Sequence, residues 1–298
     1  MGKEVAVIAV HGIGSYAASF DDPDTRFDRH LLRGLRSGLK QDFDAFVRYE
    51  PVLWSDAKLE RQQDTLLQEN KREKLFRDLS SLVIESLSDA SNYQYFGVED
   101  SRFAGSGYLI ANRLYHDALL KLQGRLTGGE APLVIVAQSM GCHVTSSYQW
   151  DAAKDPRRIL GPQGGTVSAF CALQTTASVF FTGCNVPILS MGVPREHKVP
   201  MRVPGPRAGL LPAEGTVWRN YFDPDDVLGF RMQPEFTTFF SGQHPSLKPA
   251  EGQAQVEDRR IEIQGLAGLT PFAHNEYWKD ARVLKDIVAA IRALINRP

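Results

Sequence analysis

Residues 133–141 read LVIVAQSMG and hold the pattern that decides the fold. Four apolar residues in a row, 133–136, predict a strand buried on both faces of a sheet. The strand is expected over 133–137, a turn at Ser139 follows it, and a helix is expected from about Gly141 to Ala153. A serine at such a strand-to-helix turn can be presented as a nucleophile, although an ordinary turn could carry the same letters.

The rest of the chain predicts more strands, separated by amphipathic helices. Strands are expected at 5–10, at 46–54 (an edge strand that Pro51 interrupts), and at 178–189, 216–222 and 259–265. Helices are expected at 24–41, 107–126 and 283–295. This alternation predicts an α/β fold: one domain over 1–298 with a mainly parallel sheet, doubly wound by helices on both faces. Ligands of such sheets bind at the carboxyl ends of the strands.

The segment 56–104 interrupts this rhythm. Residues 56–88 are charge-rich and predicted to be helical, with an apolar stripe over 75–87. The loop that follows holds three aromatic residues, Tyr93, Tyr95 and Phe96. A surface helix packed on the core would show the same pattern. The alternative prediction is a helical cap or lid over the site, which would favour an apolar acyl chain in the substrate.

Composition narrows the class of protein. The 298 residues are 43% hydrophobic and carry a net charge of −1, with no basic block that would favour nucleic acid. Three cysteines without metal-ligand spacing fit neither a disulfide framework nor a metal centre. No run has the roughly 20 apolar residues of a membrane span, and the amino-terminal apolar run is too short for a signal peptide. A cytoplasmic protein without cofactor or metal is therefore expected; its oligomeric state is left open.

A serine becomes a strong nucleophile only beside a base, with an acid to orient that base and donors for the oxyanion. In the nucleophile elbow the residues around the serine must be small, because strand and helix nearly touch; the usual pattern is G-x-S-x-G. Here Ala137 replaces the first glycine and Gly141 keeps the last. Alanine is still small, so the packing requirement can be met.

A glycine-containing loop, HGIGS at 11–15, follows the first predicted strand. It can turn the backbone N–H of Ile13 toward the site, where it would form an oxyanion hole with the N–H of Met140. His11, Gly12 and Gly14 would support this loop. A phosphate-binding loop is disfavoured, because the loop lacks the G-x-G-x-x-G spacing and no Walker lysine follows it.

The acid and the base are expected after the serine, in that order. The turn FDPDDVLG at 222–229 offers Asp223, Asp225 and Asp226 at a strand end. Asp223, directly after the strand, is expected to cap the turn. His274, in TPFAHNEYW, is the first strand-end histidine that follows. His197 and His244 also come after the serine, but they lie in proline-containing loops without a preceding strand.

These motifs resemble the α/β-hydrolase superfamily of serine esterases and lipases, and more narrowly a poorly characterised group of cytosolic bacterial α/β-hydrolases. The resemblance rests on VHGIG, AQSMGCHVTSSYQWD, FFTGCNVPIL, WRNYFDPDDVLGF and TPFAHNEYW. It implies a sheet that lacks the first antiparallel strands of the full fold, and Ser139 as the nucleophile. It also implies an acid in an Asp-x-Val pattern, which selects Asp225, with Val227 in the core and Asp226 as the alternative acid.

The sequence thus predicts a serine hydrolase that cleaves a small carboxylic ester through an acyl-enzyme, with Ser139, Asp225 and His274 as its triad. The same residues could transfer the acyl group to an alcohol or a thiol, or hydrolyse a thioester. A catalytically silent scaffold is the alternative from another class of protein. The sequence identifies neither the acyl group nor the alcohol of the substrate.

Overall fold

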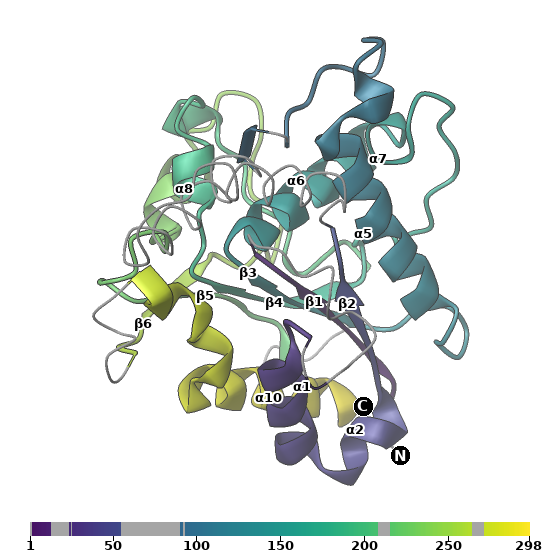
Figure 1. Ribbon diagram of the computed structural model, residues 1–298, viewed down its shortest axis with the longest axis vertical. Helices are drawn as coiled ribbons and strands as arrows, with labels where there is room; N and C mark the ends of the chain where they lie inside the picture. The colour runs from purple at the N-terminus through teal and green to yellow at the C-terminus, as the bar shows by residue number, and fades with distance from the viewer. Residues whose placement is uncertain are drawn as a thin grey trace, which may run out of the picture.

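A six-stranded, all-parallel sheet organises the molecule (Figure 1). The computed structural model describes residues 2–12, 24, 26–54, 90–91, 93–207, 215–263 and 271–298, with the backbone only at 271 and 272. The strand order is β2-β1-β3-β4-β5-β6. The strands are β1 (Val5–Val10), β2 (Val47–Val52), β3 (Leu133–Gln138), β4 (Thr176–Thr182), β5 (Trp218–Phe222) and β6 (Glu257–Arg260).

The two most apolar strands, β1 and β3, pair with each other inside the sheet, where both faces are buried. β1 lies between β2 and β3, and Val7 faces Val134 in the parallel register. Every residue of β1, and β3 up to Ala137, is buried, because helices cover both faces of the sheet. The prediction of an edge strand is confirmed, but Pro51 does not interrupt it: β2 runs through Pro51, which a strand at the sheet edge tolerates.

The helices form two layers (Figure 1). One face of the sheet packs against α1 (Arg29–Leu39), α2 (Gln41–Phe46) and α10 (Ala281–Ile295). The other face packs against α5 (Gly107–Gln123), α6 (Met140–Lys154), α7 (Arg157–Leu160) and α8 (Val186–Leu189). The short helix α9 spans Thr237–Phe240, and 3₁₀ helices span Phe103–Gly105, Arg195–His197, Gln233–Phe236, Pro271–Asn275 and Tyr277–Lys279.

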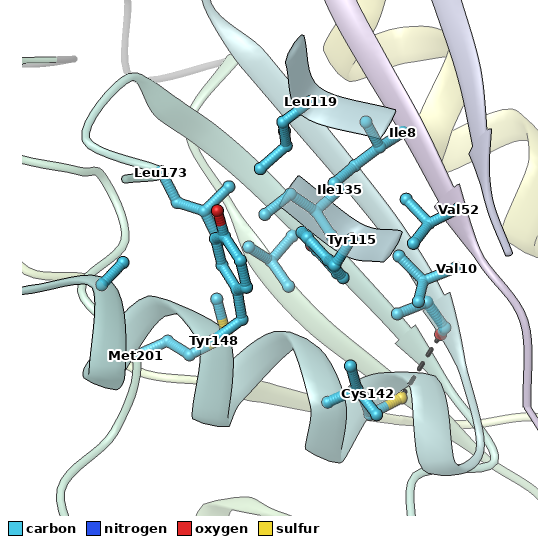
Figure 2. Packing of buried hydrophobic residues seen from close by; sticks show 14 of the residues in the cluster. Ile8, Val10, Val52, Tyr115, Leu119, Ile135, Cys142, Tyr148, Leu173 and Met201 are labelled. Atoms are coloured by element: carbon cyan, nitrogen blue, oxygen red, sulfur yellow. Dashed lines mark hydrogen bonds between the residues drawn. The ribbon is translucent and has the colours of Figure 1, made fainter. Parts of the chain in front are cut away.

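The core beneath α6 fixes the orientation of that helix. Figure 2 shows Cys142 and Tyr148 pointing from α6 toward the side chains of β1 and β3, among them Ile8 and Ile135. The Cys142 thiol donates to the carbonyl of Ala137, 3.4 Å away, at the end of β3. One side of α6 is thereby committed to the core, and the opposite side is left for other contacts.

The predicted parallel α/β sheet is confirmed, and no antiparallel strand occurs in the described part of the chain. Two predicted strands were too long. The strand predicted to run to residue 189 ends at Thr182, because Gly183 turns the chain with φ +54° and Val186–Leu189 is helical. The last strand is Glu257–Arg260 and ends five residues before the predicted boundary of 265. Most of the predicted cap of 56–104, namely residues 56–89 and 92, lies outside the described residues.

Candidate active site

Ser139 occupies a strained turn between β3 and α6. Its backbone has φ +52° and ψ −125°, a combination that L-residues seldom adopt, and its N–H donates to the carbonyl of Thr182 at 2.9 Å. It is the N-cap residue of α6, yet its side chain caps nothing. The turn therefore leaves the hydroxyl free, as a nucleophile elbow requires.

Two glycines allow this turn to fit against the end of β1. A Cβ on Gly141 would lie 2.4 Å from the carbonyl oxygen of His11, and a Cβ on Gly12 would lie 2.6 Å from the Ser139 Cβ. Only residues without a Cβ let backbone and helix approach so closely. The predicted packing roles of Gly12 and Gly141 agree with this geometry.

His274 is held by Asp226, the alternative acid of the prediction. Nδ1 of the imidazole lies 2.8 Å and 3.0 Å from the two carboxylate oxygens of Asp226, and both residues are buried. An ionised carboxylate only accepts, so Nδ1 carries the proton and Nε2 is left with its lone pair. The network thus sets the imidazole tautomer that a general base needs.

The prediction that Asp225 lies against His274 is wrong. Asp225 is exposed, and its N–H donates to the Asp223 carboxylate at 2.9 Å. Val227, predicted to enter the core, is 61% exposed. Both errors have one cause: Asp223 closes a tight turn just after β5, and that turn rotates residue 226, not 225, toward the sheet.

Asp223 caps this turn as expected, and also anchors it to the next strand connection. Its second carboxylate oxygen accepts the N–H of Ile263 at 2.7 Å. Tyr277 joins the two aspartates: its hydroxyl accepts the N–H of Asp223 at 2.9 Å and donates to Asp226 at 2.8 Å. The acid is therefore positioned by residues from three separate segments.

The surroundings of Asp226 stabilise its carboxyl group in the ionised form. Burial by itself would raise the pKa of the Asp226 carboxyl, but hydrogen bonds and the charge of His274 outweigh burial, and the pKa lies below its usual range. The N–H of Leu228 and the hydroxyl of Tyr277 contribute to the same effect. The carboxylate is ionised at neutral pH, the state in which it can stabilise an imidazolium.

The strand ends bring His274 to the serine turn. The Gln138 side chain donates to the backbone carbonyl of His274, and Gly183 faces the imidazole so closely that a Cβ there would lie 2.9 Å from Cε1. Ser139 Oγ and His274 Nε2 are both buried, and neither has a hydrogen-bond partner among the residues the structure describes. Buried polar atoms are normally paired, and a nucleophile and its base, which need a free hydroxyl and a free lone pair for substrate, would explain why these two are not.

His11 supports the loop beside the serine as a neutral side chain. The indole ring of Trp54 stacks on the imidazole of His11, with the ring centres 4.9 Å apart. The backbone N–H of Trp54 donates to His11 Nε2 at 3.2 Å. Nε2 is therefore the acceptor, and Nδ1 carries the proton and donates to the carbonyl of Gly12 at 2.6 Å. Burial lowers the pKa of His11 to about 4, against the opposing effect of the Gly12 hydrogen bond. These contacts are compatible with the supporting role predicted for His11, which stays a prediction because residues 13–15 lie outside the described residues.

Only one of the two predicted donors of an oxyanion hole lies among the described residues. Met140 is the first residue of α6, where backbone N–H groups have no partner within the helix, and it is buried beside Ser139. Ile13 and Gly14 lie outside the described residues. The pairing of the Ile13 and Met140 N–H groups stays a prediction.

The alternative histidines lie elsewhere. His197 belongs to the exposed 3₁₀ helix Arg195–His197, and His244 uses Nδ1 to accept the N–H groups of Ser246 and Leu247. Sequence reasoning missed Tyr277 and Gly183. The position of Tyr277, three residues after His274, was a weak signal for its role. No local sequence feature indicated that Gly183 would face the imidazole.

No family model, no curated protein and no solved structure matches the chain. In the described part, no helix has the length and apolar character needed to cross a membrane. The same part contains no group of three or more His, Cys, Asp or Glu side chains that could hold a metal ion.

Proposed function

We propose that the protein is a serine hydrolase of the α/β-hydrolase type that cleaves carboxylic esters through an acyl-enzyme on Ser139. One observation carries the proposal: a buried imidazole whose Nδ1 is fixed on the Asp226 carboxylate and whose Nε2 has no partner among the described residues, beside a serine held at φ +52°. The all-parallel order of the sheet supports it, because the resemblance implies a sheet without the first antiparallel strands.

In this mechanism Ser139 Oγ attacks the ester carbonyl while His274 Nε2 takes its proton. Asp226 keeps the Nδ1 proton in place and stabilises the imidazolium that forms, without itself being protonated. The N–H of Met140 stabilises the oxyanion, together with the predicted N–H of Ile13. The imidazolium then protonates the leaving alcohol, and water repeats the sequence to release the acid.

The absence of a Ser139–His274 hydrogen bond between the described residues is compatible with this mechanism. Catalytic hydrogen bonds are often long before substrate binds and shorten in the reactive complex. The strain at Ser139 is a further reason to assign function there, because such conformations cluster at active sites.

A fluorophosphonate probe tests the proposal directly, since a base-activated hydroxyl attacks phosphorus. We expect the folded wild-type protein to be labelled once, at Ser139 by peptide mass spectrometry, and Ser139→Ala not to be labelled. Ser241→Ala, at the exposed end of α9, is the matched control and should label like wild type. A label on another residue, or no label on folded wild type, would refute a catalytic role for Ser139.

A further inference from the structure

One cavity lies against the part of α6 that turns away from the core, and a second cavity, which no α6 residue lines, lies nearby. The first, about 370 Å³, is lined by α6 residues and by the segment 186–201; the second, about 620 Å³, lies on the other side of that segment. Val193 and Lys198 line both. Volumes of this size suit small organic ligands.

The first cavity begins one helical turn from the serine. His143, Ser147 and Trp150 line it, and their spacing of about four residues places them on the side of α6 that continues from Ser139. From Ser139 to Ser147 the helix rises about 12 Å, at about 1.5 Å per residue. Val186, three residues beyond the Gly183 that faces His274, lines the same cavity. A substrate held at Ser139 could therefore extend into it.

Lys198 gives these cavities a surplus of positive charge. Its side chain is only 7% exposed, and its ammonium group contacts the carboxylate of Glu235, which also accepts from Arg195 at 3.1 Å. Two cations thus share one anion. An ammonium group has three donors, and the structure gives Lys198 this one hydrogen bond among the described residues.

The other charges around the cavities are matched. Asp151, which lines the first cavity, accepts from Arg158 at 2.9 Å and from the Tyr108 hydroxyl. Arg231, which lines the second, lies 3.6 Å from the Asp258 carboxylate. The unmatched charge therefore belongs to the Lys198–Arg195–Glu235 cluster, in which Lys198 is nearly buried while the Arg195 side chain is 63% exposed. Two cations against one carboxylate leave a surplus of positive charge at this wall, which favours an anionic ligand.

We propose that Lys198, assisted by Arg195, binds the anionic end of a substrate whose apolar middle lies along α6 and whose ester is at Ser139. The ligand class is an amphipathic ester with a terminal carboxylate or phosphate. The walls of the first cavity suit the apolar part, because Val186, Val193 and Met201 line it. The assignment of this ligand as substrate rests on the proposed function; the anion site itself does not.

Binding to Ser139→Ala, which needs no catalysis, tests the site. Isothermal titration with octanoate, octyl phosphate and octanol compares two anions with a neutral molecule of the same chain length. We expect at least one anion to bind about tenfold or more tightly than octanol, as one charge-assisted hydrogen bond allows. The preferred anion then identifies the terminal group as carboxylate or phosphate.

Three further substitutions, each made in the Ser139→Ala background, locate the effect. Lys198→Met should remove the preference for the anion, while Glu235→Gln should strengthen it by removing the competing carboxylate. Lys285→Met, an exposed site on α10 across the sheet, is the matched control and should change nothing. Because Glu235→Gln predicts a gain, the proposal stays testable if Lys198→Met folds poorly. Equal affinities for anions and octanol, or a preference unchanged in Lys198→Met, would overturn the proposal.

Turnover separates this proposal from the proposed function. With the wild-type protein, the mono-p-nitrophenyl ester of octanedioic acid should have a kcat/KM about tenfold above that of p-nitrophenyl octanoate, and Lys198→Met should reverse the order. Anion binding without any turnover would refute the substrate role and the hydrolase proposal, but not the anion site. Turnover without anion preference would refute the anion site alone.

Discussion

The turn that carries Ser139 follows β3 and the turn that carries Asp226 follows β5, two strands of one sheet separated by β4, yet the two turns are determined in different ways. The serine turn, 137–141, is set by close contact: a Cβ on Gly141 would lie 2.4 Å from a backbone oxygen. The acid turn, 222–229, is set by hydrogen bonds from distant segments, through Ile263, Tyr277 and His274. A steric requirement can be recognised from the local sequence, because it demands a small residue such as Gly141. A hydrogen-bond network formed by distant residues can use either Asp225 or Asp226, so the local sequence does not identify which one it uses.

The largest expected effect lies in the acid turn. Asp226→Asn should lower kcat by about 10⁴-fold with little change in folding, because an amide no longer holds the imidazole in the productive tautomer. Asp225→Asn, at the exposed neighbouring position, is the matched control and should stay near wild type. Steady-state rates on a p-nitrophenyl ester and circular dichroism measure both quantities. An inactive Asp225→Asn beside an active Asp226→Asn would contradict the geometry of the turn.

The second expected effect concerns pH and the serine turn. His11 has its pKa lowered to about 4 in the folded protein, against an ordinary 6.5. Between these values the unfolded chain binds a proton that the folded chain does not, so stability falls as pH drops from about 6.5 to 4. The loss should be on the order of 2–3 kcal/mol for this side chain. Protonation would also turn Nε2 into a donor facing the N–H of Trp54.

Urea unfolding at several pH values checks this effect. His11→Asn keeps a side-chain donor near the Gly12 carbonyl but does not titrate, so its stability should fall less between pH 7.5 and pH 4.5 than that of wild type. Identical pH dependence in the two proteins would show that His11 is not buried in the neutral form.

The third expected effect tests the steric requirement. Gly141→Ala should lower the free energy of unfolding by about 1–3 kcal/mol, because the added methyl forces α6 away from β1. Ser146→Ala in the same helix is the control and should change stability little. Chemical denaturation measures both. A Gly141→Ala protein as stable as wild type would contradict the close approach of α6 to the end of β1 seen in the structure.

The smallest expected effect tests how much the Tyr277 hydroxyl contributes to holding Asp226 in place. Tyr277→Phe removes one hydrogen bond to Asp226 and one from the N–H of Asp223. Stability should fall by about 1 kcal/mol, and kcat by less than tenfold, because His274 and the N–H of Leu228 still hold the carboxylate. Tyr221→Phe, whose hydroxyl donates to Asp286 at 2.7 Å, is the matched control for stability and should leave kcat unchanged. A loss of kcat as large as that of Asp226→Asn would make Tyr277 an equal partner in orienting the acid.

The same contrast explains what the sequence could predict. The predicted boundaries of β1 are those observed, and the closing helix matches α10 within two residues, because continuous burial and a 3.6-residue period are local signals. The sequence also predicted that the Ser139 turn and His274 lie near each other, because both were expected at the carboxyl ends of strands and in the expected chain order. The choice of Asp226 over Asp225 did not, because it depends on the Asp223 carboxylate capturing the N–H groups of Asp225 and Ile263. The end of β4 was missed for a related reason: apolar residues continue past Gly183, and only its backbone stops the strand.

The pairing of β1 with β3 also has a consequence for biosynthesis. Val7 must find Val134, so the strand VAVIAV leaves the ribosome long before its second neighbour exists. Contacts between residues so far apart in sequence form late and slow the folding of parallel sheets. Until then a short apolar segment of high β-propensity is exposed, which is the kind of segment that aggregates. We therefore expect the yield of folded protein in cells to depend on temperature and on chaperones that shield nascent chains, more than its equilibrium stability would indicate.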